Sequence, residues 1–241
     1  MEIVQLYEIL KNVHGACGKW WPGKSEEIFI SAILTQNTNW ANVEKALGNI
    51  KAKLIDDSNV PKNVSDFDGN LLRTLSTLSD DEIRGLIRPA GFFNVKTRRL
   101  RNLLDWISRY NFNIETVKRK AQDETGLKDL RNELLSVNGI GKETADSILC
   151  YGLDLPVFVV DAYTKRMLSR IFALEFSNIP DISDYDSVQQ VFESSYPRDV
   201  AIYQELHGLI VEHAKAYCKS KPKCGECPLQ DCSYKDTIHT V

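Results

Sequence analysis

Four of the six cysteines in this 241-residue chain fall within fifteen residues near its C-terminal end, at Cys218, Cys224, Cys227 and Cys232. Such crowding favours a metal centre over disulfides. Four thiolates in so short a span can close on one tetrahedral zinc ion or on one cubane iron-sulfur cluster, and the spacing alone does not separate the two. We expect this centre to be structural even if it holds iron. The other two cysteines, Cys17 and Cys150, are expected in the core.

A second candidate site is the turn Gly139-Ile140-Gly141, between a helix expected to end near Val137 and one expected to start near Lys142. Two glycines one residue apart let the backbone turn tightly and leave amide groups that can hold a phosphate oxygen. The pattern indicates a helix-hairpin-helix, which contacts the DNA backbone without reading sequence. The alternative is an ordinary corner between two helices.

A third candidate is Asp161, which ends the apolar run Val159-Val160. A carboxylate carried on such a run is expected to be partly buried, and a buried charge is costly unless a partner or a reaction uses it. The alternative role is the N-cap of a helix over 162–171. One side chain can serve both roles.

Helical periodicity predicts the elements that position these residues, and strand patterns are scarce, so the predicted fold class is all-α. The run Pro156–Val160 reads as a strand, an extended connector or the start of a helix. No linker divides the chain, so a second domain must be built from segments that leave and return. The predicted helices are 26–35, 40–54, 80–89, 96–110, 127–137, 143–153 and 162–171.

Composition identifies no partner, because 30 basic and 33 acidic residues give a net charge of −3 and 43% of residues are hydrophobic. It excludes collagen, coiled coil and pure disorder. Apolar runs are too short to cross a bilayer, and the N-terminus lacks a secretory pattern, so a cytoplasmic or nucleoid location is expected. Basic runs at 88–101 and 215–223 and an acidic run at 173–193 fit a polyanion partner or ordinary solvated faces about equally well.

Together these motifs resemble the endonuclease III superfamily of helix-hairpin-helix DNA glycosylases, over nearly the whole chain. Gly139-Ile140-Gly141 with Lys142 resembles its hairpin and Val160-Asp161 its catalytic aspartate. The four cysteines resemble its [4Fe–4S] loop, although the first and third gaps are each one residue shorter than the usual six and five. The resemblance implies two domains, a helical barrel over 25–152 ending in the hairpin, and 1–24 plus 153–241 carrying the cluster. Zinc is the less favoured metal.

Within the superfamily, several motifs resemble the 3-methyladenine DNA glycosylase III branch. They are Trp20-Trp21-Pro22, Leu34-Thr35-Gln36-Asn37-Thr38, Arg88-Pro89-x-Gly91-Phe92-x-Asn94-x-Lys96 and Gly141-Lys142-Glu143-x-Ala145-Asp146-x-Ile148-Leu149-Cys150-Tyr151. The members of this branch lack an iron-sulfur loop, so this chain joins alkylated-base pocket motifs to an endonuclease III-like tail.

Several residues of these motifs, together with Trp40, have candidate roles in gripping a flipped base or in contacting DNA. Trp20, Trp21 and Trp40 offer faces on which a cationic base can stack, and the alternative for each is core packing. Gln36 would fill the gap left by a flipped base, or is simply an amide at a helix end. The hairpin glycines and Lys142 would contact phosphate.

Glu143 decides the expected reaction type. Bifunctional members have a lysine at this place, whose amine attacks the sugar, and a carboxyl cannot form that imine. The sequence therefore predicts a monofunctional glycosylase in which Asp161 stabilises the oxocarbenium-like sugar and orients water. Glu143 could also read the base edge. The expected enzyme is a monomer acting on damaged double-stranded DNA, and it does not bind membranes.

The favoured substrate is an alkylated purine such as 3-methyladenine. The alternatives are a glycosylase for mismatched or deaminated pyrimidines, a bifunctional glycosylase-lyase for oxidised pyrimidines, and a DNA-binding module without catalytic activity.

Overall fold

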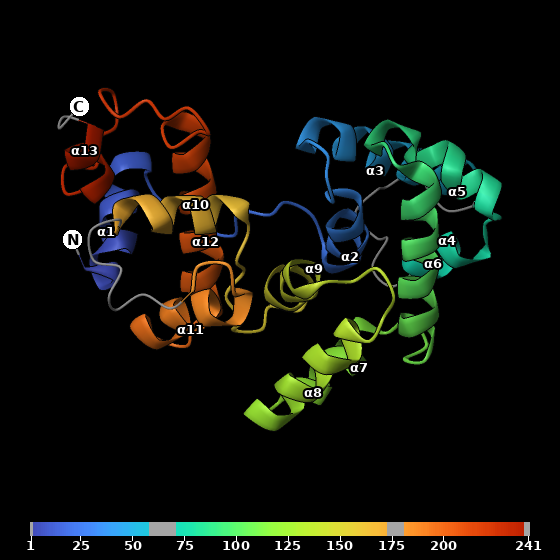
Figure 1. The fold of residues 1–241 in the computed structure, drawn as a ribbon. Coiled ribbons are helices and arrows are strands. Elements are labelled where there is room, and N and C mark those ends of the chain that lie inside the picture. Colours follow the sequence, from blue (N-terminus) through green and yellow to red (C-terminus); the bar gives the residue numbers. More distant parts are fainter. Residues whose placement is uncertain (1, 58–70, 173–180, 239–241) are drawn as a thin grey trace. The chain divides into compact units, whose positions relative to one another are not determined.

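The computed structural model describes residues 2–57, 71–172 and 181–238, and within these ranges every regular element is helical (Figure 1). None of the helices within these ranges is long and apolar enough to cross a membrane. Part of the predicted acidic run, 173–180, lies outside the described residues. The elements are α1 (Ile3–His14), α2 (Ser25–Leu34), α3 (Trp40–Asp57), α4 (Leu71–Thr77), α5 (Asp80–Ile87), η2 (Arg88–Ala90), α6 (Phe93–Ser108), α7 (Ile114–Lys118), η3 (Arg119–Ala121), α8 (Glu124–Leu135), α9 (Lys142–Ser147), the π-helical η4 (Ile148–Gly152), α10 (Ala162–Ile171), α11 (Tyr185–Ser195), α12 (Val200–Ala216) and α13 (Ser233–Ile238).

The chain forms two compact units, one made of Met1–Pro22 with Pro156–Val241 and the other of Gly23–Leu155. The second unit begins two residues before and ends three residues after the limits of 25 and 152 that the resemblance implies. The first unit is discontinuous because its N-terminal segment packs with the last third of the chain.

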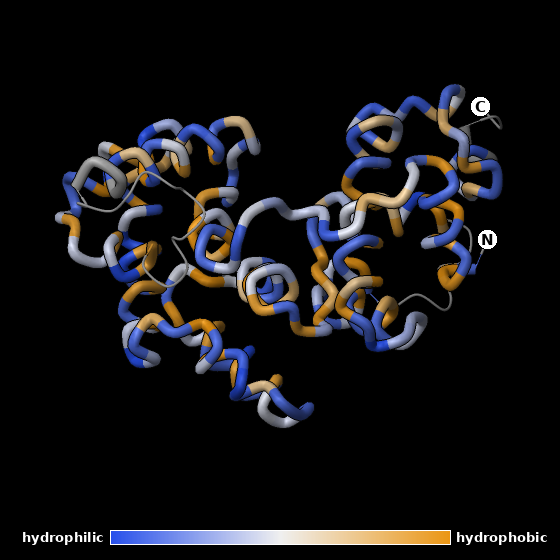
Figure 2. The backbone as a smooth tube through the Cα atoms, turned by 180° about the vertical axis from the view of Figure 1, so that it is seen from behind, coloured by the Kyte–Doolittle hydropathy of each residue, from blue (hydrophilic) through white to orange (hydrophobic). Residues whose placement is uncertain are grey.

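The unit over residues 23–155 is built around α2, in which eight of ten residues are buried. A helix that is buried on nearly all sides forms the centre of a core, and α3, α4, α6, α9 and η4 pack around α2. Phe29 of α2 stacks on Trp106 of α6, with ring centroids 6.4 Å apart. The longer α6 is amphipathic, with Leu100, Leu103, Leu104 and Ile107 on its buried face. Figure 2 shows how hydrophilic and hydrophobic residues mix along the chain.

The other unit is organised by α12, in which eleven of seventeen residues are buried. Helices α1 and α10 pack against it. Glu205 of α12 accepts hydrogen bonds from the Tyr7 hydroxyl and from the amides of Cys17 and Gly18, at 2.8 and 2.9 Å for the amides. One buried carboxylate therefore fixes the N-terminal segment to the C-terminal third. Cys17 itself is exposed, so its predicted place in the core is wrong, whereas Cys150 is fully buried.

The run Pro156–Val160 is an extended connector, not a strand. Its backbone groups bond to α11 side chains spaced four residues apart. The Tyr185 hydroxyl accepts from the Val160 amide at 3.2 Å, Gln189 donates to the Phe158 carbonyl at 2.7 Å, and Glu193 accepts from the Phe158 amide at 2.9 Å. Residues four positions apart share one helix face. The side chains on this face of α11 bond to the backbone of the connector, as a neighbouring strand would do in a sheet.

Caps account for several predicted helix ends. Asp161 caps α10, which spans the predicted residues 162–171, and Asp123 caps α8. Several predictions differ from the structure, since α3 continues to Asp57 instead of ending at residue 54, and α8 starts at Glu124 instead of residue 127. The helix expected from residue 96 starts at Phe93, after a left-handed Phe92, and the helix expected over 143–153 is α9 followed by a π-helical turn.

Candidate functional site

The two hairpin glycines have different roles. Gly139 has a φ of +95°, and a Cβ there would lie 2.3 Å from Cγ of Arg99, so both the backbone and its neighbour require glycine. Gly141 is the N-cap of α9 with extended backbone, at a φ of −93°, and a Cβ there would meet open space. The expectation that both glycines serve the tight turn is therefore correct for Gly139 only. Gly141 instead leaves open space beside the start of α9.

Gln36 lies against this hairpin. Its Nε2 donates to the Gly139 carbonyl at 3.1 Å and to the Thr144 hydroxyl at 3.0 Å, and its Oε1 accepts from Arg99. The amide thus joins the segment after α2 to both sides of the hairpin. In this conformation Gln36 holds the hairpin in its observed shape. To fill a gap in DNA, its amide must exchange these three hydrogen bonds for contacts with DNA.

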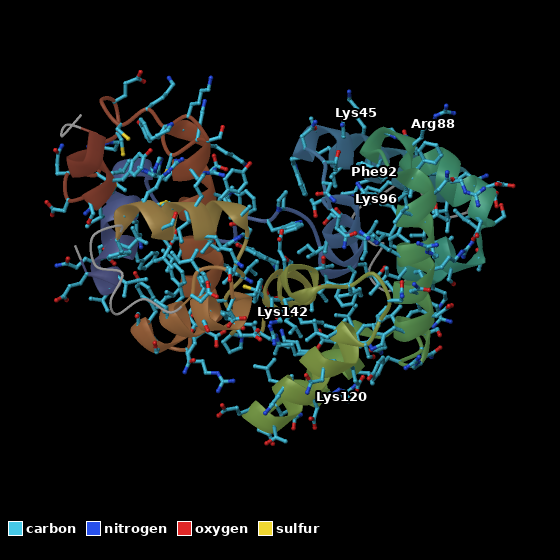
Figure 3. The ribbon with its side chains drawn as sticks, in the orientation of Figure 1. Lys45, Arg88, Phe92, Lys96, Lys120 and Lys142 are labelled. Carbon is cyan, nitrogen blue, oxygen red and sulfur yellow. The ribbon has the colours of Figure 1, made fainter. Side chains whose placement is uncertain are left out.

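Lys96 is only 1% exposed, although it belongs to the run from which a basic surface was expected. Its ammonium donates to the carbonyls of Leu34 and Ala90, each at 2.8 Å. Burial, and to a smaller extent the charge of Arg99, lowers the pKa of Lys96 to about 8. The Lys96 ammonium therefore caps carbonyl groups at the C-terminal ends of α2 and η2 inside the unit (Figure 3). The basic run 88–101 consequently presents one cation fewer at the surface than predicted.

Two residues without an assigned role brace the helices on either side of the hairpin. Asp146 of α9 is fully buried and accepts two hydrogen bonds from Arg131 of α8, at 2.7 and 3.0 Å. A bidentate pair fixes orientation as well as distance. The sequence signal for this ion pair is Asp146, a charged residue on the apolar face of the helix that follows the hairpin.

Phe92 is another residue whose role the motifs did not reveal. Its side chain is 67% exposed, and its backbone is left-handed with a φ of +45° (Figure 3). An exposed phenyl ring on such backbone is uncommon, because left-handed geometry is unfavourable for bulky residues. It lies in the same unit as the hairpin, at the start of α6.

Lys142 and Glu143 are the first two residues of α9. Lys142 is half-buried and labelled in Figure 3, and Glu143 is exposed. The helix after the hairpin therefore presents a carboxyl group to solvent at its second position.

Asp161 is half-buried, with 13% of its side chain exposed. Its Oδ1 accepts from the Thr164 amide at 2.7 Å and from the Thr164 hydroxyl at 2.9 Å, which is the N-cap arrangement. Its Oδ2 lies 3.8 Å from Nε2 of His207, a buried residue of α12. Burial lowers the pKa of His207, while the charge of Asp161 opposes this shift. The imidazole beside the carboxylate is therefore neutral at neutral pH.

Trp20 and Trp21 lie in the unit that carries Asp161. Trp20 is half-buried, donates its indole N–H to Glu212 at 2.9 Å, and has the Lys215 ammonium 5.0 Å from its ring centroid. Trp21 is 8% exposed and meets Trp20 edge to face, at 6.2 Å between centroids. Trp40 begins α3 in the other unit and is half-buried.

The four C-terminal cysteines line one cavity together with Arg170, His213 and Tyr217, and all four are free thiols. Nη1 of Arg170 lies 3.3 Å from Sγ of Cys218, and Nε2 of His213 lies 3.4 Å from Sγ of Cys227. Among the described residues no three ligands stand close enough to hold a single metal ion. The donor set fits a centre with one thiolate on each of four irons, because those sulfurs need not meet at one ion.

The cysteine loop is bonded to the helix that Asp161 caps. Arg166 of α10 donates to the Cys218 carbonyl at 2.8 Å, and Arg170 donates to the Ser220 carbonyl at 3.0 Å. The loop and Asp161 thus share α10 as a common support, with the loop bonded to its second half and Asp161 at its first turn.

Comparison with known proteins gives this arrangement a family. Residues 30–194 match the family described as HhH-GPD superfamily base excision DNA repair protein. The chain is 41% identical over 232 residues to a Methanocaldococcus jannaschii protein named as a candidate DNA repair glycosylase, covering 95% of this chain and 94% of that protein.

Solved structures share the fold. The 3-methyladenine DNA glycosylase of H. pylori, bound to 1,N6-ethenoadenine, is 29% identical with a TM-score of 0.71, covering 90% of this chain and 98% of that one. Endonuclease III trapped as a covalent intermediate with DNA has a TM-score of 0.69 at 19% identity, covering 99% and 100% of the two chains, and this likeness concerns the fold alone.

Proposed function

The chain belongs to the HhH-GPD superfamily of base-excision DNA repair proteins and is a DNA glycosylase, a hydrolase of N-glycosyl bonds; from this premise we propose that it is monofunctional and removes alkylated purines such as 3-methyladenine. The observation that carries the reaction type is Glu143, a carboxyl group exposed after the hairpin where bifunctional members have an amine. No imine with the sugar can form there.

The surroundings of Trp20 support the choice of base. Its ring already has an ammonium group, that of Lys215, 5.0 Å from its centroid, and Glu212 bonds to its N–H. An electron-rich ring beside a carboxylate favours positive charge, and 3-methyladenine is cationic in DNA. The likeness to the H. pylori glycosylase agrees with this choice.

In the proposed reaction, the C1′–N bond breaks and its electron pair leaves with the base, so that 3-methyladenine departs neutral. Positive charge develops on the sugar, where the Asp161 carboxylate stabilises it. Water then adds to C1′, and its proton passes to the carboxylate or to solvent. A cationic base is already a good leaving group, so little acid catalysis is required.

DNA binding is assigned to three features. The backbone beside Gly141 and the side chain of Lys142 would contact phosphates. Phe92, exposed on the unit that carries the hairpin, is suited to stack against bases of a distorted duplex. The lysines of the cysteine loop would add non-specific attraction.

We assign the cysteine cavity to a [4Fe–4S] cluster, with zinc as the less favoured metal. Cys218, Cys224, Cys227 and Cys232 would hold it. When bound, the cluster supplies a rigid crosslink that fixes the lysine-bearing loop to α10, and it takes no part in bond cleavage.

The decisive experiment is a glycosylase screen over duplexes with alkylated, oxidised, deaminated and mismatched bases, with and without alkali. We expect release of 3-methyladenine and strand breaks only after heat and alkali. A borohydride-trapped adduct of the unmodified protein would overturn the monofunctional assignment, whereas Glu143→Lys is expected to create such an adduct. Release of only mismatched or deaminated pyrimidines would overturn the substrate assignment.

The base pocket is tested separately. Trp20→Ala should reduce excision of 3-methyladenine more than binding of an abasic duplex, since only the former places a base on the ring. Val4→Ala, which changes an exposed apolar residue of α1 on the same unit, is the control and should change neither. Equal losses of excision and binding in Trp20→Ala would assign the ring to packing alone.

A further inference from the structure

The two oxygens of Asp161 are not equivalent. Oδ1 accepts two hydrogen bonds from Thr164, at 2.7 and 2.9 Å, and holds the start of α10. Oδ2 takes no part in that cap. Oδ2 is therefore the oxygen with more capacity left to face a positively charged sugar.

The group that faces Oδ2 is His207, whose Nε2 lies 3.8 Å away. Only 3% of the His207 side chain is exposed, and it comes from α12, which packs against α10. An anionic oxygen beside Nε2 favours the tautomer with the proton on that nitrogen. At 3.8 Å the contact is longer than a hydrogen bond, and such contacts commonly shorten when substrate binds.

The imidazole ring is held in place by two aromatic residues. Trp20 meets it edge to face, at 5.7 Å between centroids, and Phe158 does the same at 6.4 Å. Gly208 makes this possible, since a Cβ there would lie 2.2 Å from Cβ of Trp20. Three separate segments of the chain thus converge to fix one buried imidazole beside the carboxylate.

We propose that His207 is a positioning residue, which holds Oδ2 of Asp161 in the orientation that stabilises the positive sugar. This inference rests on the proposed role of Asp161. His207 does not touch the sugar; it acts through the carboxylate by donating Nε2–H to Oδ2. The cap bonds to Oδ1 and the imidazole contact to Oδ2 together define the plane of the carboxylate.

The test uses two DNA duplexes and requires no knowledge of the base. One carries a pyrrolidine abasic analogue, which is positively charged as the sugar is in the transition state, and the other carries a neutral tetrahydrofuran analogue. The unmodified protein should bind the charged duplex about 10²-fold more tightly. His207→Phe should reduce this preference about tenfold and leave the affinity for the neutral duplex unchanged.

Conservative variants separate positioning from folding. In His207→Gln the side-chain amide can reach the place of Nε2, so most of the preference should return, whereas His207→Asn is too short and should lose it. Tyr203→Phe is the matched control, because it removes a buried hydroxyl of α12 that donates to the Glu193 carbonyl at 3.5 Å, on a ring that packs on Phe158. If His207→Phe does not fold, the Gln and Asn variants decide, and equal preferences would overturn the proposal.

Asp161→Asn separates the two assignments. If it retains the preference for the charged duplex, Asp161 is not the stabilising carboxylate and both assignments are wrong. If Asp161→Asn loses the preference while His207→Phe keeps it, the role of Asp161 stands and that of His207 is overturned. Adding His207→Phe to Asp161→Asn should cause no further loss, because His207 acts through the carboxylate.

Discussion

The hairpin and the surroundings of Asp161 are built in opposite ways. At the hairpin, polar atoms are directly bonded. Gln36 bonds to Gly139, Thr144 and Arg99, and Arg131 bonds to Asp146 through two nitrogens. At Asp161, one oxygen is bonded within the cap, and the other faces an imidazole at 3.8 Å.

This difference suits the two tasks. A surface that holds the DNA backbone benefits from fixed geometry, since any ordering on binding reduces affinity. A carboxylate that stabilises a transition state must interact most strongly when positive charge develops on the sugar. Because the contact between His207 and Asp161 is still longer than a hydrogen bond, the free energy of shortening it remains available for the reaction. If this interpretation is correct, changes at the hairpin will appear mainly in stability and DNA affinity, and changes at Asp161 mainly in rate.

The largest effect is expected from Arg131→Met. It leaves the fully buried Asp146 carboxylate without its bidentate partner, and breaking such a pair costs about 3–5 kcal/mol of unfolding free energy. Urea unfolding measures the loss. Arg131→Met with Asp146→Leu should recover most of it, since the isolated charge is then absent.

The matched control for that variant is Arg84→Met. Arg84 pairs with Asp81, a side chain that is 90% exposed, so the loss should stay below about 1 kcal/mol. A loss below about 1 kcal/mol in Arg131→Met as well would mean that the Arg131–Asp146 pair is no more than a surface contact.

Asp161→Asn should lower the single-turnover rate of excision by about 10² or more, while the affinity for damaged duplex changes little. Asparagine is also a good N-cap, so α10 should persist. The control is Asp184→Asn, because Asp184 caps α11 through Ser187 in the same manner and should leave the rate intact. A loss of binding equal to the loss of rate would end the distinction between the two regions.

The sequence predicted those parts of the molecule that depend on neighbours along the chain. The span of α10 follows from Asp161 as its cap, and the hairpin position follows from two helices that end and start around Gly139. The all-helical fold follows from periodicity. Each of these signals lies within a few residues of the structure it specifies.

What could not be predicted depends on distant segments. Lys96 was expected on a basic surface, and only the packing of α6 against α2 brings it to the Leu34 carbonyl. His207 stands 46 positions after Asp161, and no local pattern relates the two. Cys17 is exposed because Glu205, far along the chain, bonds to its amide and holds that segment on the outside of α12.

A smaller effect is expected from Cys224→Ser in the cysteine cavity. With a ligand removed, bound metal should be lost, and the loop should no longer hold its lysines against α10. DNA affinity should fall about tenfold, more than the single-turnover rate at saturating protein, and iron analysis with visible absorption reports the metal. Cys17→Ser, an exposed thiol outside the cavity, should alter neither. If the affinity for DNA stays unchanged after complete metal loss, the lysines of the cysteine loop take no part in DNA binding.

The smallest effect is expected from Lys142→Ala. If this side chain contacts one phosphate, its loss should weaken binding only a few-fold for any sequence and reduce the slope of log K against log salt by about one. Binding titrations from low to moderate salt give that slope. Lys120→Ala is the control, because the Lys120 ammonium is bonded to Glu133 and to the Tyr110 hydroxyl, and its slope should match that of the unmodified protein. If Lys142→Ala slowed excision without changing the slope, the first residue of α9 would belong to the chemistry, and the hairpin would no longer be a region concerned with binding alone.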